Sequence, residues 1–233
     1  LAICAYDVCV MFADEKSVFS GSLDLNKALF KEGLSMKSAV AAVGLLLGTV
    51  QAGMADPCHD RFVELYKQLD QGVPTKTFVT TAFKGAPPMT NDFLYLNHDH
   101  HMSVPIDPPQ AWVLTYRNVM YQSSDEGKSW AKVRDLDASQ NAEGAIAAKA
   151  ENAKTIRNAA CGTEEIDGVA HDTLEADLTV SQGMVTENHY KYWVRPDDGF
   201  IVKATYDTKA PNFEMAITQV IEKVPDLKLP TPE

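Results

Sequence analysis

The stretch YKYWVRPDDGFIVK, residues 190–203, indicates the architecture of this chain. Aromatic and β-branched residues on both sides of a Pro-Asp-Asp-Gly segment are typical of two antiparallel strands joined by a turn. We therefore expect strands over residues 184–194 and 200–206, with the turn at 196–199. The rest of the chain from residue 56 onward repeats this pattern and predicts an antiparallel sheet with few helices.

Short runs with a two-residue period continue on both sides of the hairpin. Turn signals such as Asp167-Gly168 separate them, and such short connections join antiparallel neighbours. A cluster of prolines between positions 105 and 109 indicates a loop. The last run allows either a strand or a short helix. The expected strands cover residues 76–83, 92–97, 111–116, 119–123, 129–134, 169–180, 184–194, 200–206 and 213–222.

Two stretches follow a helical pattern instead. Asp56-Pro57 is typical of a helix start, and apolar residues follow at helical spacing until Gly72. Residues 138–160 are rich in alanine and contain no proline, which predicts a second helix. A long antiparallel meander must bury one of its faces. Either the sheet curls around the two helices, or it closes into a barrel.

These hairpins resemble those of the outer-membrane lipoprotein-sorting (LolA-like) superfamily and its lipid-binding relatives. Residues 190–203 resemble the family's strand, Trp-Val-x-x-x-x-Gly turn and return strand, and residues 161–169 resemble the preceding hairpin. Residues 218–221 with Leu229-Pro230 resemble its closing strand. The resemblance implies an α+β fold, a strongly curved antiparallel sheet (half-barrel) with two helices covering the concave face. It also implies an apolar cavity for acyl chains.

The N-terminal part of the sequence indicates export. From Met36, Lys37 precedes an uncharged, mostly apolar run over residues 39–50, and Gly53-Met54-Ala55 supplies small residues for a signal peptidase. That run is too short to span a bilayer, which takes about 20 residues. We expect residues 1–35 to be an upstream extension outside the fold, 36–55 a secretory signal peptide, and 56–233 one periplasmic domain without a transmembrane segment. The alternative is an N-terminal core helix.

Two cysteines, Cys58 and Cys161, belong to the expected mature chain. An even pair in an oxidising compartment predicts one disulfide. It would close a loop of about 100 residues and constrain the unfolded chain. The alternative is two buried free thiols.

Charge and motifs exclude several classes of function. The chain carries 32 acidic and 21 basic residues, for a net charge of −11. Because nucleic-acid affinity comes mostly from Lys and Arg on phosphates, we expect no nucleic-acid partner. No nucleophile motif and no phosphate-binding glycine loop is present. We therefore expect a protein without catalytic residues and without a cofactor.

The segment His98-Asp99-His100-His101 is the most conspicuous polar cluster. On a strand, His98 and His100 would share a face, where two imidazoles could bind Zn²⁺ or Cu²⁺ with His171 or His189 as a third ligand. No metal-site spacing supports this, so we expect a solvated loop. A metal site at His98, His100 and His101, or a hydrolase that uses it, is an alternative.

The strands are rich in aromatic residues, which either fill the core or line a cavity. Our leading hypothesis is a non-catalytic binding protein for a lipid or another amphipathic ligand with an acyl chain. The alternative is an interaction or sensor module with a filled core and an envelope protein partner on the sheet surface. The candidate cavity residues are Phe78, Phe93, Tyr95, Trp112, Tyr116, Tyr121, Tyr192 and Trp193.

Overall fold

The computed structural model describes residues 2–5, 8–11, 56–182 and 184–232. Strands β1 (Ala2–Ala5) and β2 (Val8–Met11) form a two-stranded sheet of their own. The predicted signal peptide, residues 36–55, lies outside the described residues, as does the predicted upstream extension apart from β1 and β2. The described part of residues 56–233 forms one continuous sheet with two helices.

That main sheet has eleven antiparallel strands in the order β8-β7-β6-β5-β4-β3-β13-β12-β11-β10-β9. The first and last strands of the domain, β3 and β13, pair in the middle of it. The strands are β3 (Thr75–Phe83), β4 (Met89–Asn97), β5 (His100–Asp107), β6 (Trp112–Tyr116), β7 (Val119–Ser123), β8 (Ala131–Asp135), β9 (Arg157–Ile166), β10 (Val169–Gln182), β11 (Met184–Val194), β12 (Ile201–Ala210) and β13 (Phe213–Lys223).

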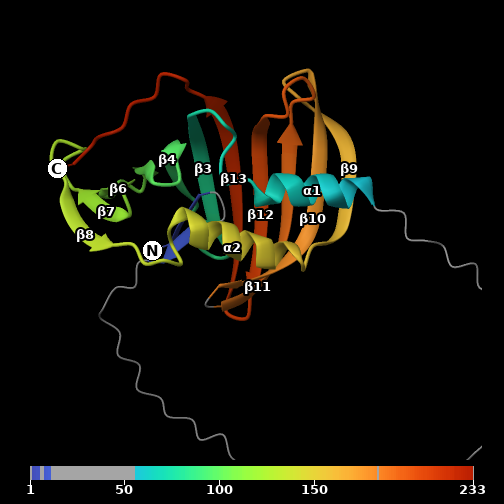
Figure 1. Ribbon diagram of the computed structural model, residues 1–233, viewed down its shortest axis with the longest axis horizontal. Coiled ribbons are helices and arrows are strands. Elements are labelled where there is room, and N and C mark those ends of the chain that lie inside the picture. The colour runs from blue at the N-terminus through green and yellow to red at the C-terminus, as the bar shows by residue number, and fades with distance from the viewer. Residues whose placement is uncertain (1, 6–7, 12–55, 183, 233) are drawn as a thin grey trace, which may run out of the picture.

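The two helices, α1 (Pro57–Lys67) and α2 (Ala142–Ala153), lie across the same face of the β9–β12 half of the sheet (Figure 1). Strands β4–β8 form the other half, and the C-terminal tail runs back over the upper edge of the molecule towards them. The sheet does not close, because β8 and β9 are both edge strands. The predicted α+β half-barrel is therefore confirmed.

Aromatic residues fill the space between α1 and the sheet. Phe62 and Tyr66 of α1 are almost fully buried, and the Phe62 ring lies 5.4 Å from that of Tyr192. The Tyr66 ring lies 6.1 Å from that of Tyr190. On β11 the inward residues Asn188, Tyr190 and Tyr192 alternate with outward ones, as strand geometry requires. The helix–sheet interface is thus a packed core.

Local chemistry explains where α1 begins and how it is anchored. The Asp56 side chain accepts a hydrogen bond of 3.0 Å from the Cys58 backbone N–H, and Pro57 occupies the first turn. Cys58 forms a disulfide with Cys161 on edge strand β9, across a sequence separation of 103 residues. The predicted disulfide is confirmed, and it ties the helix to the outermost strand.

Two sequence predictions of local structure were partly wrong. The second helix ends at Ala153, and residues 157–160, expected to be helical, begin strand β9. Pairing with β10 gives this segment backbone partners that outweigh its alanine-rich helix propensity. The predicted proline loop is only partly correct, because Pro108 and Pro109 lie in the loop before β6, whereas Pro105 lies in a strand. Residues 100–107 form strand β5, paired with both β4 and β6.

Candidate functional site

A groove of about 680 Å³ lies at the end of the sheet where β3, β9, β10, β11, β12 and β13 come together. Its charged residues alternate with the inward-facing core residues, so they point away from the helices. The volume is in the range of pockets that hold small ligands. Its lining residues are Ala82, Phe83, Lys84, Arg157, Asp177, Glu187, Asn188, His189, Asp207, Thr208, Lys209, Glu214, Met215 and Ala216.

Strand register explains why this part of the face is hollow. One cross-strand row runs through Asp177, His189, Asp207, Ala216 and Ala82, each directly opposite the next. The last two residues carry only a methyl group, whereas their neighbours in the row are longer. The hollow therefore has an alanine floor at β13 and β3 and a polar wall along β10, β11 and β12.

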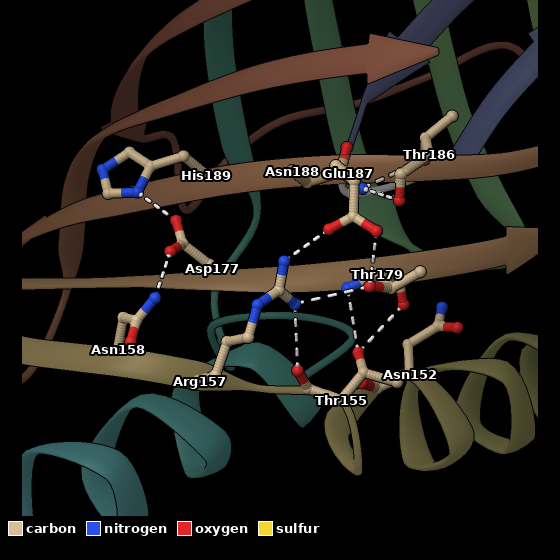
Figure 2. Close-up of polar contacts among 10 residues, drawn as sticks. All are labelled: Asn152, Thr155, Arg157, Asn158, Asp177, Thr179, Thr186, Glu187, Asn188 and His189. Carbon is tan, nitrogen blue, oxygen red and sulfur yellow. Dashed lines mark hydrogen bonds and ion pairs between the residues drawn. The ribbon is translucent and has the colours of Figure 1, made fainter. Parts of the chain in front are cut away.

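One polar wall is built on Asp177 of β10 (Figure 2). The Asn158 amide donates a hydrogen bond of 2.7 Å to Asp177 Oδ2, and His189 Nδ1 lies 2.9 Å from Asp177 Oδ1. The hydrogen bond from Asn158, followed by that from His189, lowers the pKa of Asp177 below its usual value. Asp177 therefore stays ionised and holds both partners across three strands.

Arg157, at the start of β9, organises the next part of the wall. Its guanidinium forms an ion pair with Glu187 and donates hydrogen bonds to the Thr155 carbonyl and the Thr179 hydroxyl (Figure 2). The Thr179 hydroxyl also lies 3.0 Å from Glu187 Oε1. These contacts join the end of α2 to β10 and β11, and so fix the groove's outer rim.

The opposite end of the groove combines charge with apolar surface. Lys84 Nζ lies 2.9 Å from Glu214, and this contact lowers the pKa of Glu214. Immediately beside it, the rings of Phe83 and Phe213 pack edge to face with centroids 6.3 Å apart, and Met215 lies next to them on the inner face. Of these three inner-face residues, Phe83 and Met215 also line the groove.

The predicted cavity residues do not share one surface. Phe93, Tyr95 and Tyr192 are buried in the core, whereas Trp193 alternates to the other face of β11. Phe78 is 42% exposed. None of the eight predicted residues lines the groove, and whether any of them lines a ligand cavity stays a prediction.

The other three lie in the β6–β7 half of the sheet. Trp112 and Tyr121 are partly buried, and Trp112 packs close to Gly127. The Tyr116 ring lies 4.8 Å from the ring of His100. These rings support the fold of that half, at a distance in the strand order from the groove-forming strands.

The predicted histidine cluster is divided among separate partners. His98 Nε2 lies 3.1 Å from the Gln140 carbonyl, and His100 Nε2 lies 2.9 Å from the Pro230 carbonyl. His101 packs on Phe93, and its Nδ1 is shielded from solvent and has no hydrogen-bond partner among the residues that the structure describes. Burial, together with His98, lowers the pKa of His101 to about 4.

No group of three or more His, Cys, Asp or Glu side chains among the described residues is arranged to hold a metal ion. His171 and His189, the proposed third ligands, are both engaged on β10 and β11. His171 Nδ1 lies 2.8 Å from the Val169 carbonyl, and His189 contacts Asp177. A metal site at His98, His100 and His101 therefore has no support in this geometry.

The sequence analysis did not predict the groove. It named one of the lining residues, His189, but only as a possible third ligand for a metal. Its residues come from six strands, and only the register between strands brings them together. One signal was available: acidic and basic residues alternate with buried ones along both 184–194 and 200–210. That pattern predicts a charged face but does not show where it is hollow.

No protein-family model and no curated protein matches this sequence. Among solved structures, a chain of the MucA/MucB complex of Pseudomonas aeruginosa is similar, with 13% identity and a TM-score of 0.41. The match covers 72% of this chain and spans 58% of the length of that one.

Two further structures come from the superfamily to which the hairpins pointed. A LolA superfamily protein from Nitrosomonas europaea is 11% identical, with a TM-score of 0.33, and the match covers 73% of this chain and 94% of the other. A lipoprotein-sorting protein domain from Vibrio parahaemolyticus is 11% identical, with a TM-score of 0.32 and coverages of 73% and 95%. The resemblance predicted from the sequence is thus found again among solved structures.

A search of the described residues for a helix long and apolar enough to cross a membrane finds none.

Proposed function

We propose that this chain is a non-catalytic binding protein of the periplasm whose ligand is amphipathic and lies in the groove. The observation that carries the proposal is the arrangement of the groove itself. An ionic row on β10, β11 and β12 adjoins an alanine floor, and the apolar residues Phe83 and Met215, from the inner face of β3 and β13, also line the groove at the end of the sheet. A molecule with a charged head and an acyl chain meets complementary surface at both of its ends.

The position of the ligand follows from packing. An acyl chain gains about 0.8 kcal/mol for each CH₂ group that it buries, so it needs an apolar space to enter. Between α1 and the sheet that space is occupied by Phe62, Tyr66 and their tyrosine neighbours on β11. We therefore place the ligand in the groove at the end of the sheet, away from the core under α1. The disulfide, which forms in oxidising compartments, supports the periplasmic location.

To test whether the ligand binds in the groove, one alanine of its floor is replaced by a large side chain that fills it. Ala216 is exposed on the floor, so Ala216→Trp should fold normally and abolish uptake of a fluorescent fatty acid. Thr218→Trp is the matched control, because it lies two residues further along the same face of β13 and outside the groove. Native mass spectrometry of the purified chain should also show retained lipid. Absence of uptake by the parent chain, or equal uptake by both variants, would contradict the proposal.

A second candidate is a protein-interaction module with a filled core. One observation favours it: Phe78 and Val220, directly opposite each other on β3 and β13, are 42% and 47% exposed. A photo-crosslinker at position 78 would capture an envelope protein partner if this face binds one. Crosslinking at that position, combined with no amphiphile uptake, would favour this candidate over the first.

A further inference from the structure

The charged side chains of the groove divide into those that have hydrogen-bonding or ionic partners among the described residues and those that do not. Arg157 pairs with Glu187, Lys84 with Glu214, and Asp177 with its neighbours Asn158 and His189. These groups are held by the protein itself. A ligand would have to break such contacts in order to bind them, which costs about as much as it gains.

Asp207 and Lys209 differ from these paired groups. Neither Asp207 nor Lys209 makes a side-chain hydrogen bond, or an ion pair within 4.0 Å, with any residue that the structure describes. Lys209 lies directly opposite Glu187 on β11 and Glu214 on β13, which pair with Arg157 and Lys84, and its charge adds to the lowering of the Glu214 pKa. Both residues are exposed on β12. The groove therefore offers one anion and one cation that are available to a ligand.

Their spacing defines what that ligand must carry. Residues 207 and 209 share one face of β12, so their Cα atoms lie about 6.6 Å apart at the usual strand rise. Asp207 is opposite Ala216, which leaves open space over the floor beside the carboxylate. An ammonium group can enter there while an anionic group a few ångströms away reaches the Lys209 amine.

We propose that the groove recognises a zwitterionic head group of the phosphoethanolamine type, with its ammonium at Asp207 and its phosphate at Lys209. The primary ammonium donates hydrogen bonds to the carboxylate, and the Lys209 ammonium donates to phosphate oxygens. The inference rests on the proposed function, because it names the head of the amphipathic ligand. The same chemistry belongs to a phospholipid head and to free phosphoethanolamine.

The experiment compares ligands that differ only in their heads. Isothermal titration would use lysophosphatidylethanolamine and lysophosphatidylglycerol with the same acyl chain, below their critical micelle concentrations, together with free O-phosphoethanolamine. The ethanolamine lipid should bind about fivefold more tightly than the glycerol lipid, as one additional exposed ion pair provides. Binding of free phosphoethanolamine as well would identify a small-molecule ligand, and binding of the lipid alone a membrane lipid; both results support the head-group inference.

Charge-removing variants assign the two roles. Asp207→Asn should abolish the preference between the two lipids, since only the ethanolamine lipid carries the ammonium group. Lys209→Met should weaken the binding of both lipids, since both carry the phosphate. Asp226→Asn and Lys228→Met are matched controls, because they form another exposed acid–lysine pair two residues apart and outside the groove. They should keep the preference.

A failure of the head-group inference can be distinguished from a failure of the proposed function. Equal affinity for both lipids in the parent chain, an unchanged preference in Asp207→Asn, or unchanged affinities in Lys209→Met overturns the head-group inference and leaves the proposed amphiphile binding intact. Binding of neither lipid and of no fatty acid overturns both. Circular dichroism of each variant establishes that the fold is retained.

Discussion

At the scale of single residues, the buried amine of Lys149 stands out on α2. Its Nζ donates a hydrogen bond of 2.7 Å to the Tyr66 carbonyl and lies 4.6 Å from the centroid of the Tyr66 ring. Tyr66 is in the last turn of α1, where helix carbonyls lack intrahelical partners and attract positive charge. Lys149, which interrupts the apolar stripe of α2 in the sequence, therefore links the two helices.

Replacing this lysine should destabilise the domain. Lys149→Met keeps the length of the side chain but leaves the Tyr66 carbonyl buried without this donor, which costs about 1–3 kcal/mol. Urea unfolding followed by circular dichroism measures the change in the free energy of unfolding. Lys154→Met, at the exposed end of the same helix, is the control and should have a much smaller effect. Equal stabilities of the two variants would show that the buried contact contributes nothing.

The candidate site also illustrates the residue scale. His189 could be named from the sequence as a polar residue of interest, but its partner Asp177 and the hollow beside Asp207 could not. They follow from pairings between β10, β11, β12 and β13, which place residues far apart in sequence in a single row. The local sequence pattern predicts on which face of the sheet a residue lies. It does not predict the register between strands, which determines the residue's neighbours.

At the scale of elements, most strands were predictable because each buries alternate residues between turn signals. The exceptions have physical causes. Strand β9 is an edge strand with a mostly exposed surface, so residues 157–160 lack the alternation that identifies a strand. Strand β5 contains Pro105, which removes one backbone donor, but the strand still pairs on both sides through its other residues. In residues 157–160 and in β5, pairing with neighbouring strands outweighed the conformational preference of the local sequence.

The connection between α1 and β9 yields a prediction at this scale. The disulfide from Cys58 to Cys161 joins the first helix to the edge of the sheet and closes a loop of 103 residues. In the chain-entropy model, loss of such a link costs about 2–5 kcal/mol. The double variant Cys58→Ser/Cys161→Ser should therefore have a lower free energy of unfolding, measured in urea.

The reduced parent chain provides the comparison. A reducing agent should lower the stability of the parent to that of the double variant, and should leave the double variant unchanged. Because α1 also covers Tyr190 and Tyr192, loosening this link should increase amide hydrogen exchange in α1 before it does so in β12 or β13. A parent chain insensitive to reduction would show that packing alone fixes the helix.

At the scale of the whole molecule, the two halves of the sheet use different means of burial. The β9–β12 half is covered by helices, whereas β3 and β4 bury Thr77 and Phe93 on the inner side of the curved sheet, where β5 contributes the partly buried His101. The C-terminal tail reinforces this second half through the contact between Pro230 and His100. Protonation of a residue inside the second half should therefore affect the stability of the entire domain.

His101 is such a protonatable residue in the second half of the sheet. Burial and then His98 hold its pKa at about 4 in the folded state, against 6.5 for the ordinary side chain. As the pH falls from about 6.5, the unfolded chain takes up a proton that the folded chain does not, so the free energy of unfolding decreases until about pH 4. The loss over this window is roughly 3 kcal/mol at most.

The variant His101→Phe isolates this effect, because a phenyl ring preserves the packing on Phe93 and Tyr95 and cannot be protonated. At pH 8 both proteins carry an uncharged ring, and their difference in stability reports packing alone. Between pH 6.5 and pH 4 the parent should lose stability faster than the variant, as measured by urea unfolding at each pH. Parallel curves for the two proteins would show that His101 is protonated without cost inside the fold, and that the inner side of β5 admits water.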